Sequence, residues 1–359
     1  MHKRRPRGTL ASLAADLGVS RTTVSNAYNH PDQLSPALRA RILAAAEARG
    51  YPGPDPTARS LRTRRVGSLG VLLTEDLSYA FEDYASVEFL AGLADSPFAL
   101  TLVPTGSDGG NRGLVDSVVV DGFVVYSVAS DDPGLAAVRT TGLPFVVCDQ
   151  PYDVEGHSFV GIDDASSAAL AARAVAQAGH RRIGILAKRL MRARFDGPVS
   201  PAELPTADLH VQRARVHGVL EELAAWGVDK RTIPIVTRHH NDEASAADGA
   251  RELLERNPDL TAVVCTTDSM ALGALAYAHD QRIEVPRELS ITGFDGIELA
   301  KARGLTTIAQ PLKAKGRMCG KLLSSAVTER LKDQAPADPK RVLLKAHLIP
   351  GATLAPLEP

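Results

Sequence analysis

The chain has 359 residues, of which 44% are hydrophobic, and a net charge of −1. This length predicts two or three globular domains with sizeable cores, and no apolar stretch approaches the roughly 18 residues of a membrane span. The basic N-terminus is not followed by the apolar segment of an export signal, so we expect a cytoplasmic protein. The three cysteines lie far apart and form no CxxC pair, which argues against a disulfide framework or a zinc site.

The net charge conceals an asymmetry along the chain. Residues 1–65 contain twelve Lys and Arg against four Asp and Glu, a net charge of +8, and the remaining residues carry −9. A basic segment ahead of an acidic one predicts a polyanionic partner for the basic segment alone. A solvated charged surface would give the same counts, so the interpretation depends on the motifs within the segment.

Three short amphipathic helices are predicted in the basic segment. Thr9 can cap the first helix, which Gly18 ends, and Ser20 can cap the second. The second helix runs to about Asn29, and Ser35, followed by proline, begins a third. The three-residue turn between the first two helices is the helix-turn-helix pattern.

A hinge is predicted over residues 54–65. Asp55 can cap a very short helix with Pro56 at its first position. A helix of this length is marginal on its own. A plain linker between two domains is the alternative interpretation.

From Val66 onward the chain alternates short apolar runs with helical patterns. The apolar runs predict strands at 69–73, 99–103, 122–126, 145–148, 183–186, 232–236, 262–265 and 289–292. Helices are expected between them, among others at 165–178, 213–225 and 244–256. This alternation predicts parallel sheets with crossover helices, arranged as two doubly wound lobes.

The run from Thr9 to Asn29 resembles the head of the LacI family of repressors. The resemblance continues through Arg49-Gly-Tyr51 and Ala58-Arg-Ser-Leu61. The later motifs Gly179-His-Arg-Arg-Ile-Gly-Ile, Asp268-Ser-Met-Ala-Leu-Gly273 and Gly293-Phe-Asp295 resemble the periplasmic-binding-protein-like core of the same family.

The resemblance implies an all-α helix-turn-helix head joined by a hinge to an α/β two-lobed periplasmic-binding-protein-like core with parallel sheets. The expected boundaries are 1–53 for the head, 54–65 for the hinge and 66–359 for the core. Within the core, we expect the first lobe at about 66–163 and 306–333, and the second lobe at about 164–305 and 334–359.

The second helix of such a head lies in the major groove, with its first turn facing the base edges. We therefore expect Arg21, Thr22 and Asn26 to contact bases; contact of Arg21 with phosphate alone is the alternative. Short side chains that would form hydrogen bonds to DNA phosphates and fix the register on the duplex are Thr9, Ser20, Thr23, Ser25 and Asn29. The resemblance adds Ala58 and Leu61 of the hinge, and implies that Leu61 wedges into the minor groove.

Ligands of open parallel sheets bind beyond the carboxyl ends of the strands. Candidates that follow the predicted strands are Thr74, Tyr126, Asp149, Thr267 and Asp295. The resemblance adds Arg215, which together with Asp295 would suit a diol. Further candidates for the effector site are Phe81, Tyr84 and Asp268. A role in the core is an equally good interpretation of the aromatic candidates, and Asp268 can equally cap a helix.

The resemblance implies a homodimeric transcriptional repressor that binds pseudo-palindromic operator DNA and a small-molecule effector, with a sugar or sugar derivative as the expected class. No cofactor and no membrane partner is expected. A metal site is not expected either, because the histidines lack cysteine or carboxylate partners at ligand spacing. The sequence shows no Ser/His/Asp arrangement and no Gly-rich phosphate loop, so we do not expect an enzyme. A transport binding protein and a sugar-processing enzyme with the same core are the alternatives.

Overall fold

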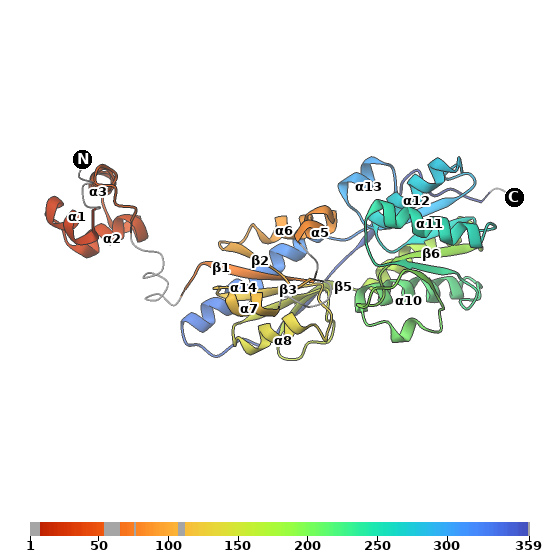
Figure 1. Cartoon of the computed structure of the whole chain (residues 1–359), viewed down its shortest axis with the longest axis horizontal. Helices are drawn as coiled ribbons and strands as arrows, with labels where there is room; N and C mark the ends of the chain where they lie inside the picture. Colours follow the sequence, from red (N-terminus) through yellow and green to blue (C-terminus); the bar gives the residue numbers. More distant parts are fainter. Residues whose placement is uncertain (1–7, 54–64, 75–76, 107–111, 358–359) are drawn as a thin grey trace. The chain divides into compact units, whose positions relative to one another are not determined.

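The computed structural model describes residues 8–53, 65–74, 77–106 and 112–357 (Figure 1). The chain divides into two compact units, Met1–Val66 and Gly67–Pro359. The predicted hinge, with its candidates Ala58 and Leu61, lies outside the described residues except for Arg65. None of the helices in the described ranges is long and apolar enough to cross a membrane.

The first unit is a bundle of short helices. Its elements are α1 (Leu10–Leu17), α2 (Arg21–Asn29), the 3-10 turn η1 (Pro31–Gln33) and α3 (Pro36–Ala48). Thr9 and Ser12 form a capping box at the start of α1, and Gly18 ends that helix with a left-handed φ of 64°. The side chains that pack the bundle are Leu13, Ala14, Val24, Ala27, Ile42 and Ala46. The predicted helix-turn-helix is confirmed.

The first sheet of the second unit is entirely parallel, in the order β12-β5-β4-β3-β1-β2. Its strands are β1 (Ser68–Leu73), β2 (Ala99–Pro104), β3 (Gly122–Tyr126), β4 (Phe145–Cys148), β5 (Ser158–Ile162) and β12 (Arg341–Leu344). The helices around it are α5 (Leu77–Glu82), α6 (Tyr84–Leu93), α7 (Arg112–Ser117), α8 (Pro133–Thr140) and α14 (Leu312–Leu331). Side chains of α6 and α14 pack on one face, and those of α7 and α8 on the other. Coverage of both faces explains why β1, β3 and β4 are buried throughout.

The second sheet has the order β13-β11-β10-β9-β6-β8-β7. Its strands are β6 (Ile183–Lys188), β7 (Gly197–Val199), β8 (Ile235–Arg238), β9 (Ala262–Cys265), β10 (Ser290–Asp295), β11 (Thr306–Ala309) and β13 (His347–Ile349). The inner pairs are parallel, and β7 and β13 pair antiparallel at the two edges. The accompanying helices are α9 (Asp164–Gln177), η2 (Leu204–Thr206), α10 (His210–Ala225), α11 (Glu243–Arg256), α12 (Asp268–Asp280) and α13 (Glu298–Ala302). The α9–α10 and α11–α12 pairs cover opposite faces of this sheet.

The chain crosses between the two sheets three times, and the crossings correct the expected lobe boundaries. β11 pairs within the second sheet, although 306–333 was assigned to the first lobe. β12 pairs with β5 in the first sheet, although 334–359 was assigned to the second lobe. The apolar pattern of a short strand does not state which sheet it joins, so the exchange of single strands was not visible in the sequence.

The short α6 is held closely against α14. A Cβ atom at Gly92 would lie 2.0 Å from the carbonyl oxygen of Lys313, and one at Gly316 would lie 2.2 Å from that of Phe89. Only glycine allows the two helix backbones to approach so closely. This contact fixes α6, which borders the candidate site described below.

Candidate nucleic-acid interface and effector cavity

The first turn of α2 is presented to solvent. Ser20 caps the helix, because its Oγ accepts a hydrogen bond from the Thr23 backbone N–H at 3.0 Å. Arg21 and Thr22 follow and are exposed, whereas Val24 and Ala27 on the opposite face are buried in the bundle. The amphipathic helix therefore has an outward face that carries two of the three predicted base-contacting residues.

Other predicted DNA-contacting side chains already form hydrogen bonds within the first unit. Asn26 donates from Nδ2 to Gln33 Oε1 at 3.0 Å, and Asn29 donates from Nδ2 to Ser25 Oγ at 3.0 Å. Thr9 Oγ1 accepts from the Ser12 backbone N–H at 3.1 Å. Asn26 would have to exchange its bond to Gln33 for one to a base, while Arg21 has no such bond to exchange among the described residues.

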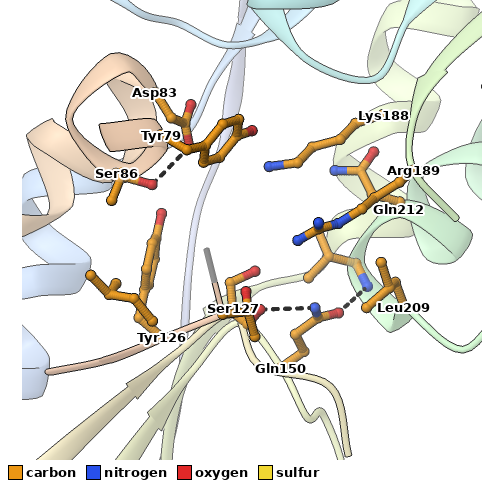
Figure 2. A pocket seen from close by; sticks show the side chains of 14 residues that line it. Tyr79, Asp83, Ser86, Tyr126, Ser127, Gln150, Lys188, Arg189, Leu209 and Gln212 are labelled. Carbon is orange, nitrogen blue, oxygen red and sulfur yellow. Dashed lines mark hydrogen bonds between the residues drawn. The ribbon is translucent and has the colours of Figure 1, made fainter. Parts of the chain in front are cut away.

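A cavity of about 570 Å³, part of it open to solvent, lies between the two lobes of the second unit (Figure 2). It sits at the carboxyl ends of β1, β3, β4 and β6, as the strand pattern predicts. Its polar lining from the first lobe is Thr74, Tyr79, Asp83, Ser86, Tyr126, Ser127 and Gln150, and from the second lobe Lys188, Arg189 and Gln212. Thr74 and Tyr126 are therefore the two predicted effector residues that line this cavity.

Tyr126 presents a neutral phenol to the cavity. Its ring stacks on Phe89 with 4.1 Å between ring centroids. Burial, together with the nearby charges of Asp83 and Asp149, raises the pKa of Tyr126 well above its usual value. The Ser86 hydroxyl, a hydrogen-bond partner of Tyr126, also donates to Asp83 Oδ2 at 2.7 Å. The first lobe thus holds a short polar chain that ends in a carboxylate.

Arg215 and Asp295 lie together, as expected of a pair that would hold a diol, but they are already bonded. Arg215 donates from Nε to Asp164 Oδ1 at 2.9 Å and from Nη1 to Asp295 Oδ1 at 3.1 Å. The guanidinium also lies 3.7 Å from the centroid of the Phe294 ring. Burial raises the pKa of Asp295 to about 6, although the Arg215 charge acts in the opposite direction.

The same cluster continues into the first lobe through Gln310. Its Nε2 donates to Asp295 Oδ1 at 2.6 Å, and its Oε1 accepts from Lys315 Nζ. Lys315, which is fully buried, also donates to Asp149 Oδ1 at 2.6 Å. Burial opposes the charged ammonium, but Asp149 and its acidic neighbours keep the pKa of Lys315 above its usual value. Arg215, Asp295, Asp149 and their partners thus form a continuous buried network between the lobes, adjacent to the cavity lining.

The predicted residues Thr267 and Asp268 serve the second lobe's own packing. Thr267 caps α12, because its Oγ1 accepts from the Met270 backbone N–H, and it donates to Asn241 Oδ1 at 2.7 Å. Asp268 accepts hydrogen bonds from the Ile297 backbone N–H and from Thr307 Oγ1. Burial and the charge of Asp295 raise the pKa of Asp268 to about 8.

Phe81 and Tyr84 do not line the cavity either. Phe81 is 60% exposed on α5, and Tyr84 is 50% exposed at the start of α6. Lys188 also lines the cavity and was not predicted; because it directly ends β6, the strand-end rule that applies to Thr74 applies to it as well. Asp83 and Gln212 carried no such signal, because their positions depend on how helices α6 and α10 pack.

A helix-turn-helix unit and a two-lobed α/β core in one chain define a DNA-binding regulator with a ligand-binding type of core. The model of the periplasmic binding protein-like domain matches residues 172–354. The HTH-type transcriptional regulator IpsA of Corynebacterium glutamicum is 49% identical over 99% of this chain and 100% of its own length.

Solved structures agree with this class. The crystal structure of a LacI-family transcriptional regulator from Corynebacterium glutamicum is 44% identical, covers 98% of this chain and 100% of its own, and superimposes with a TM-score of 0.73. The complex of the transcriptional regulator CelR with cellobiose is 27% identical over 97% of this chain and 100% of its own, with a TM-score of 0.69. The chain belongs to the LacI family of transcriptional regulators.

Proposed function

We propose that the chain is a repressor that binds operator DNA as a homodimer and releases or retains it according to a sugar or sugar derivative bound in the core. The observation that carries this proposal is the polar cavity at the carboxyl ends of four parallel strands, lined by both lobes of one chain. The CelR structure, which holds cellobiose, supports the effector class. A regulator of this kind acts where the chromosome is, so we propose a cytoplasmic location. We also propose that it has no enzymatic activity.

In the proposed complex, the first turn of α2 enters the major groove. The exposed Arg21 can fork onto O6 and N7 of a guanine, with Thr22 beside it, and Asn26 can bridge N6 and N7 of an adenine. Phosphate contacts fall to the shorter side chains Thr9, Ser20, Thr23, Ser25 and Asn29. Two such helices in a dimer would reach adjacent major grooves about 34 Å apart, which requires a pseudo-palindromic site.

The hinge connects this recognition to the effector. We propose that residues 54–65 form paired helices in the operator complex, with Ala58 in the helix and Leu61 inserted into the minor groove. The effector would act by changing the relation of the lobes, and hence whether the two hinges can pair. It can do so only if its affinity for the two states differs.

The effector contacts divide into two groups. Thr74 and Tyr126 reach it directly from the cavity wall. Arg215 and Asp295, and Asp149 beyond them, belong to the buried network, so a diol would contact them only by exchanging an existing bond. Phe81, Tyr84, Thr267 and Asp268 are not included in the proposed contact set, because the first two are exposed and the others are bonded within the second lobe.

Selection of DNA from a random pool by the purified full chain tests the regulator function. We expect the selected sequences to share a pseudo-palindrome whose half-sites are separated by about one helical turn. Sizing the complex on that DNA should show two chains per site. Selected sequences without symmetry, or binding that disappears at moderate salt for every sequence alike, would contradict the proposal, because the second behaviour is that of non-specific phosphate contact.

A further inference from the structure

Among the charged groups that line the effector cavity, Asp83 and Lys188 have opposite charges and do not pair with each other, whereas the third, Arg189, has an interaction of its own. Asp83 immediately precedes α6 in the first lobe, and Lys188 ends β6 in the second; Figure 2 shows them on opposite sides of the cavity. Asp83 is 8% exposed, and among the described residues its carboxylate accepts one hydrogen bond, from Ser86. Lys188 forms no salt bridge in the described part of the chain; its ammonium lies 5.3 Å from the centroid of the Tyr79 ring.

The incomplete pairing of Asp83 and Lys188 favours a ligand that contacts both side chains. Asp83 is buried and Lys188 is half-buried, and a charge removed from water without full compensation has lost hydration that nothing has replaced. The Gln212 side chain, 7% exposed, lines the second-lobe side of the cavity, and its Oε1 has no hydrogen-bond partner among the described residues. The cavity therefore contains polar groups on both walls whose hydrogen-bonding capacity the protein itself does not use.

The two walls of the cavity also differ in whether their charged groups accept or donate hydrogen bonds. The first-lobe wall ends in the Asp83 carboxylate, which only accepts hydrogen bonds, whereas the charged groups of the second-lobe wall, the Lys188 ammonium and the Arg189 guanidinium, only donate them. A hydroxyl group both donates and accepts, so one polyol can donate to Asp83 and accept from Lys188. A carboxylate or phosphate on the ligand would suit Lys188 but would be repelled by Asp83, and an amino group would meet the reverse conflict.

We propose that Asp83 and Lys188 determine effector specificity by holding opposite edges of an uncharged polyhydroxyl ligand, with Gln212 adding a hydrogen bond on the second-lobe side. This inference rests on the proposed function, because it names the ligand class of the same cavity. Since Asp83 belongs to the first lobe and Lys188 to the second, one ligand molecule that binds both would connect the lobes. Asp83 would at the same time exclude the acidic relatives of that ligand.

Ligand class is tested first, by thermal shift of the full chain. The probes are neutral pentoses, hexoses, disaccharides and polyols, with uronic acids and sugar phosphates alongside them. We expect stabilisation by a neutral compound and none by its acidic counterpart. Binding by acidic compounds alone would overturn the inference and leave the regulator intact. Stabilisation by no compound of any class would contradict the effector part of the proposed function itself, and the inference with it.

The residues are tested with the neutral compound that binds. Asp83→Asn and Lys188→Met should each weaken its binding at least tenfold, while the affinity of the ligand-free protein for selected DNA stays within twofold. Asp83→Asn should also strengthen binding of the acidic counterpart, which a merely structural role would not do. The matched controls are Glu82→Gln and Arg194→Met, because both side chains are exposed and neither lines the cavity. They should bind the compound as the parent protein does.

A direct attraction between Asp83 and Lys188 is the competing explanation. It predicts that each substitution lowers the melting temperature of the ligand-free protein and that the double variant melts no lower than either single variant. It also predicts that the loss of effector affinity is proportional to the loss of stability. That pattern would overturn the inference. Unchanged effector affinity in Asp83→Asn would overturn it as well, while the response of the parent protein would still support the proposed function.

Discussion

Arg215→Met tests the buried network most severely. Arg215 is 4% exposed, and its guanidinium reaches Asp164 at 2.9 Å and Asp295 at 3.1 Å. Methionine keeps much of the apolar stem but leaves both carboxylates without their cation. Breaking a buried ion pair by removing one partner costs about 3–5 kcal/mol, because the remaining charge stays uncompensated. Losing the contact with the Phe294 ring adds about 0.5–2 kcal/mol.

The measurement is the free energy of unfolding of the full chain in urea at pH 7, monitored by tryptophan fluorescence. Trp226 is the single tryptophan and ends α10, the helix that carries Arg215. Arg251→Met is the matched control, since that guanidinium also contacts two carboxylates, Asp248 and Glu255, but is 49% exposed. The control should cost about 0–1 kcal/mol, as expected for surface pairs.

If Arg215→Met lowers the free energy of unfolding by no more than the control does, the buried ion pairs do not stabilise the fold as described. The pH dependence gives a second check. Burial already raises the pKa of Asp295 to about 6 and raises that of Asp164, and loss of the cation would raise both further. Protonation removes the uncompensated charge, so the difference between variant and parent should narrow as the pH falls from 8 to 5. A difference that widens instead would contradict the assigned cause.

Three further predictions concern other parts of the molecule. Because burial raises the pKa of Asp268 to about 8, the native state keeps a proton that the unfolded state releases, and stability should fall as the pH rises from 5 to 8. In urea unfolding, Asp268→Asn should reduce this dependence of stability on pH. An unchanged dependence would contradict the prediction. Gly92→Ala should destabilise by about 1–3 kcal/mol in thermal unfolding, because its Cβ would meet the Lys313 carbonyl, whereas Gly113→Ala, with open space around it, should not. Arg21→Ala should relax base preference at one operator position by about 1–3 kcal/mol, and a uniform loss across sequences would show a phosphate contact instead.

Local signals in the sequence were sufficient for the first unit. Its caps at Thr9 and Ser20 and its stop at Gly18 act within one helical turn, so reading the chain in order places α1 and α2 at their observed bounds. The buried strands β3, β4 and β9 were likewise found at their observed bounds, because continuous apolar runs are typical of parallel strands. Strand β8 was predicted too early, since it begins at Ile235, after Pro234, which has no N–H to donate.

Contacts between distant segments limited the prediction of the site. Asp149 and Lys315 are 166 positions apart, and Arg215 and Asp295 are 80 apart, so no local pattern reveals that they join one network. The rule of strand ends led to Thr74 and Tyr126, which line the cavity. It could not lead to Asp83, which lies at the start of α6, or to Gln212, which lies on α10. Nor could it show that Asp268 is bonded to Ile297 and Thr307.

In the proposed regulator, one chain couples a ligand in the core to DNA at the helix-turn-helix. The most direct measurement is the affinity of the full chain for its selected DNA, with and without a saturating amount of the sugar that binds the core, together with the affinity for that sugar with and without DNA. We expect both affinities to change, and by the same factor, because coupling between two binding sites is reciprocal. A sugar that binds tightly and leaves the affinity for DNA unchanged would contradict it.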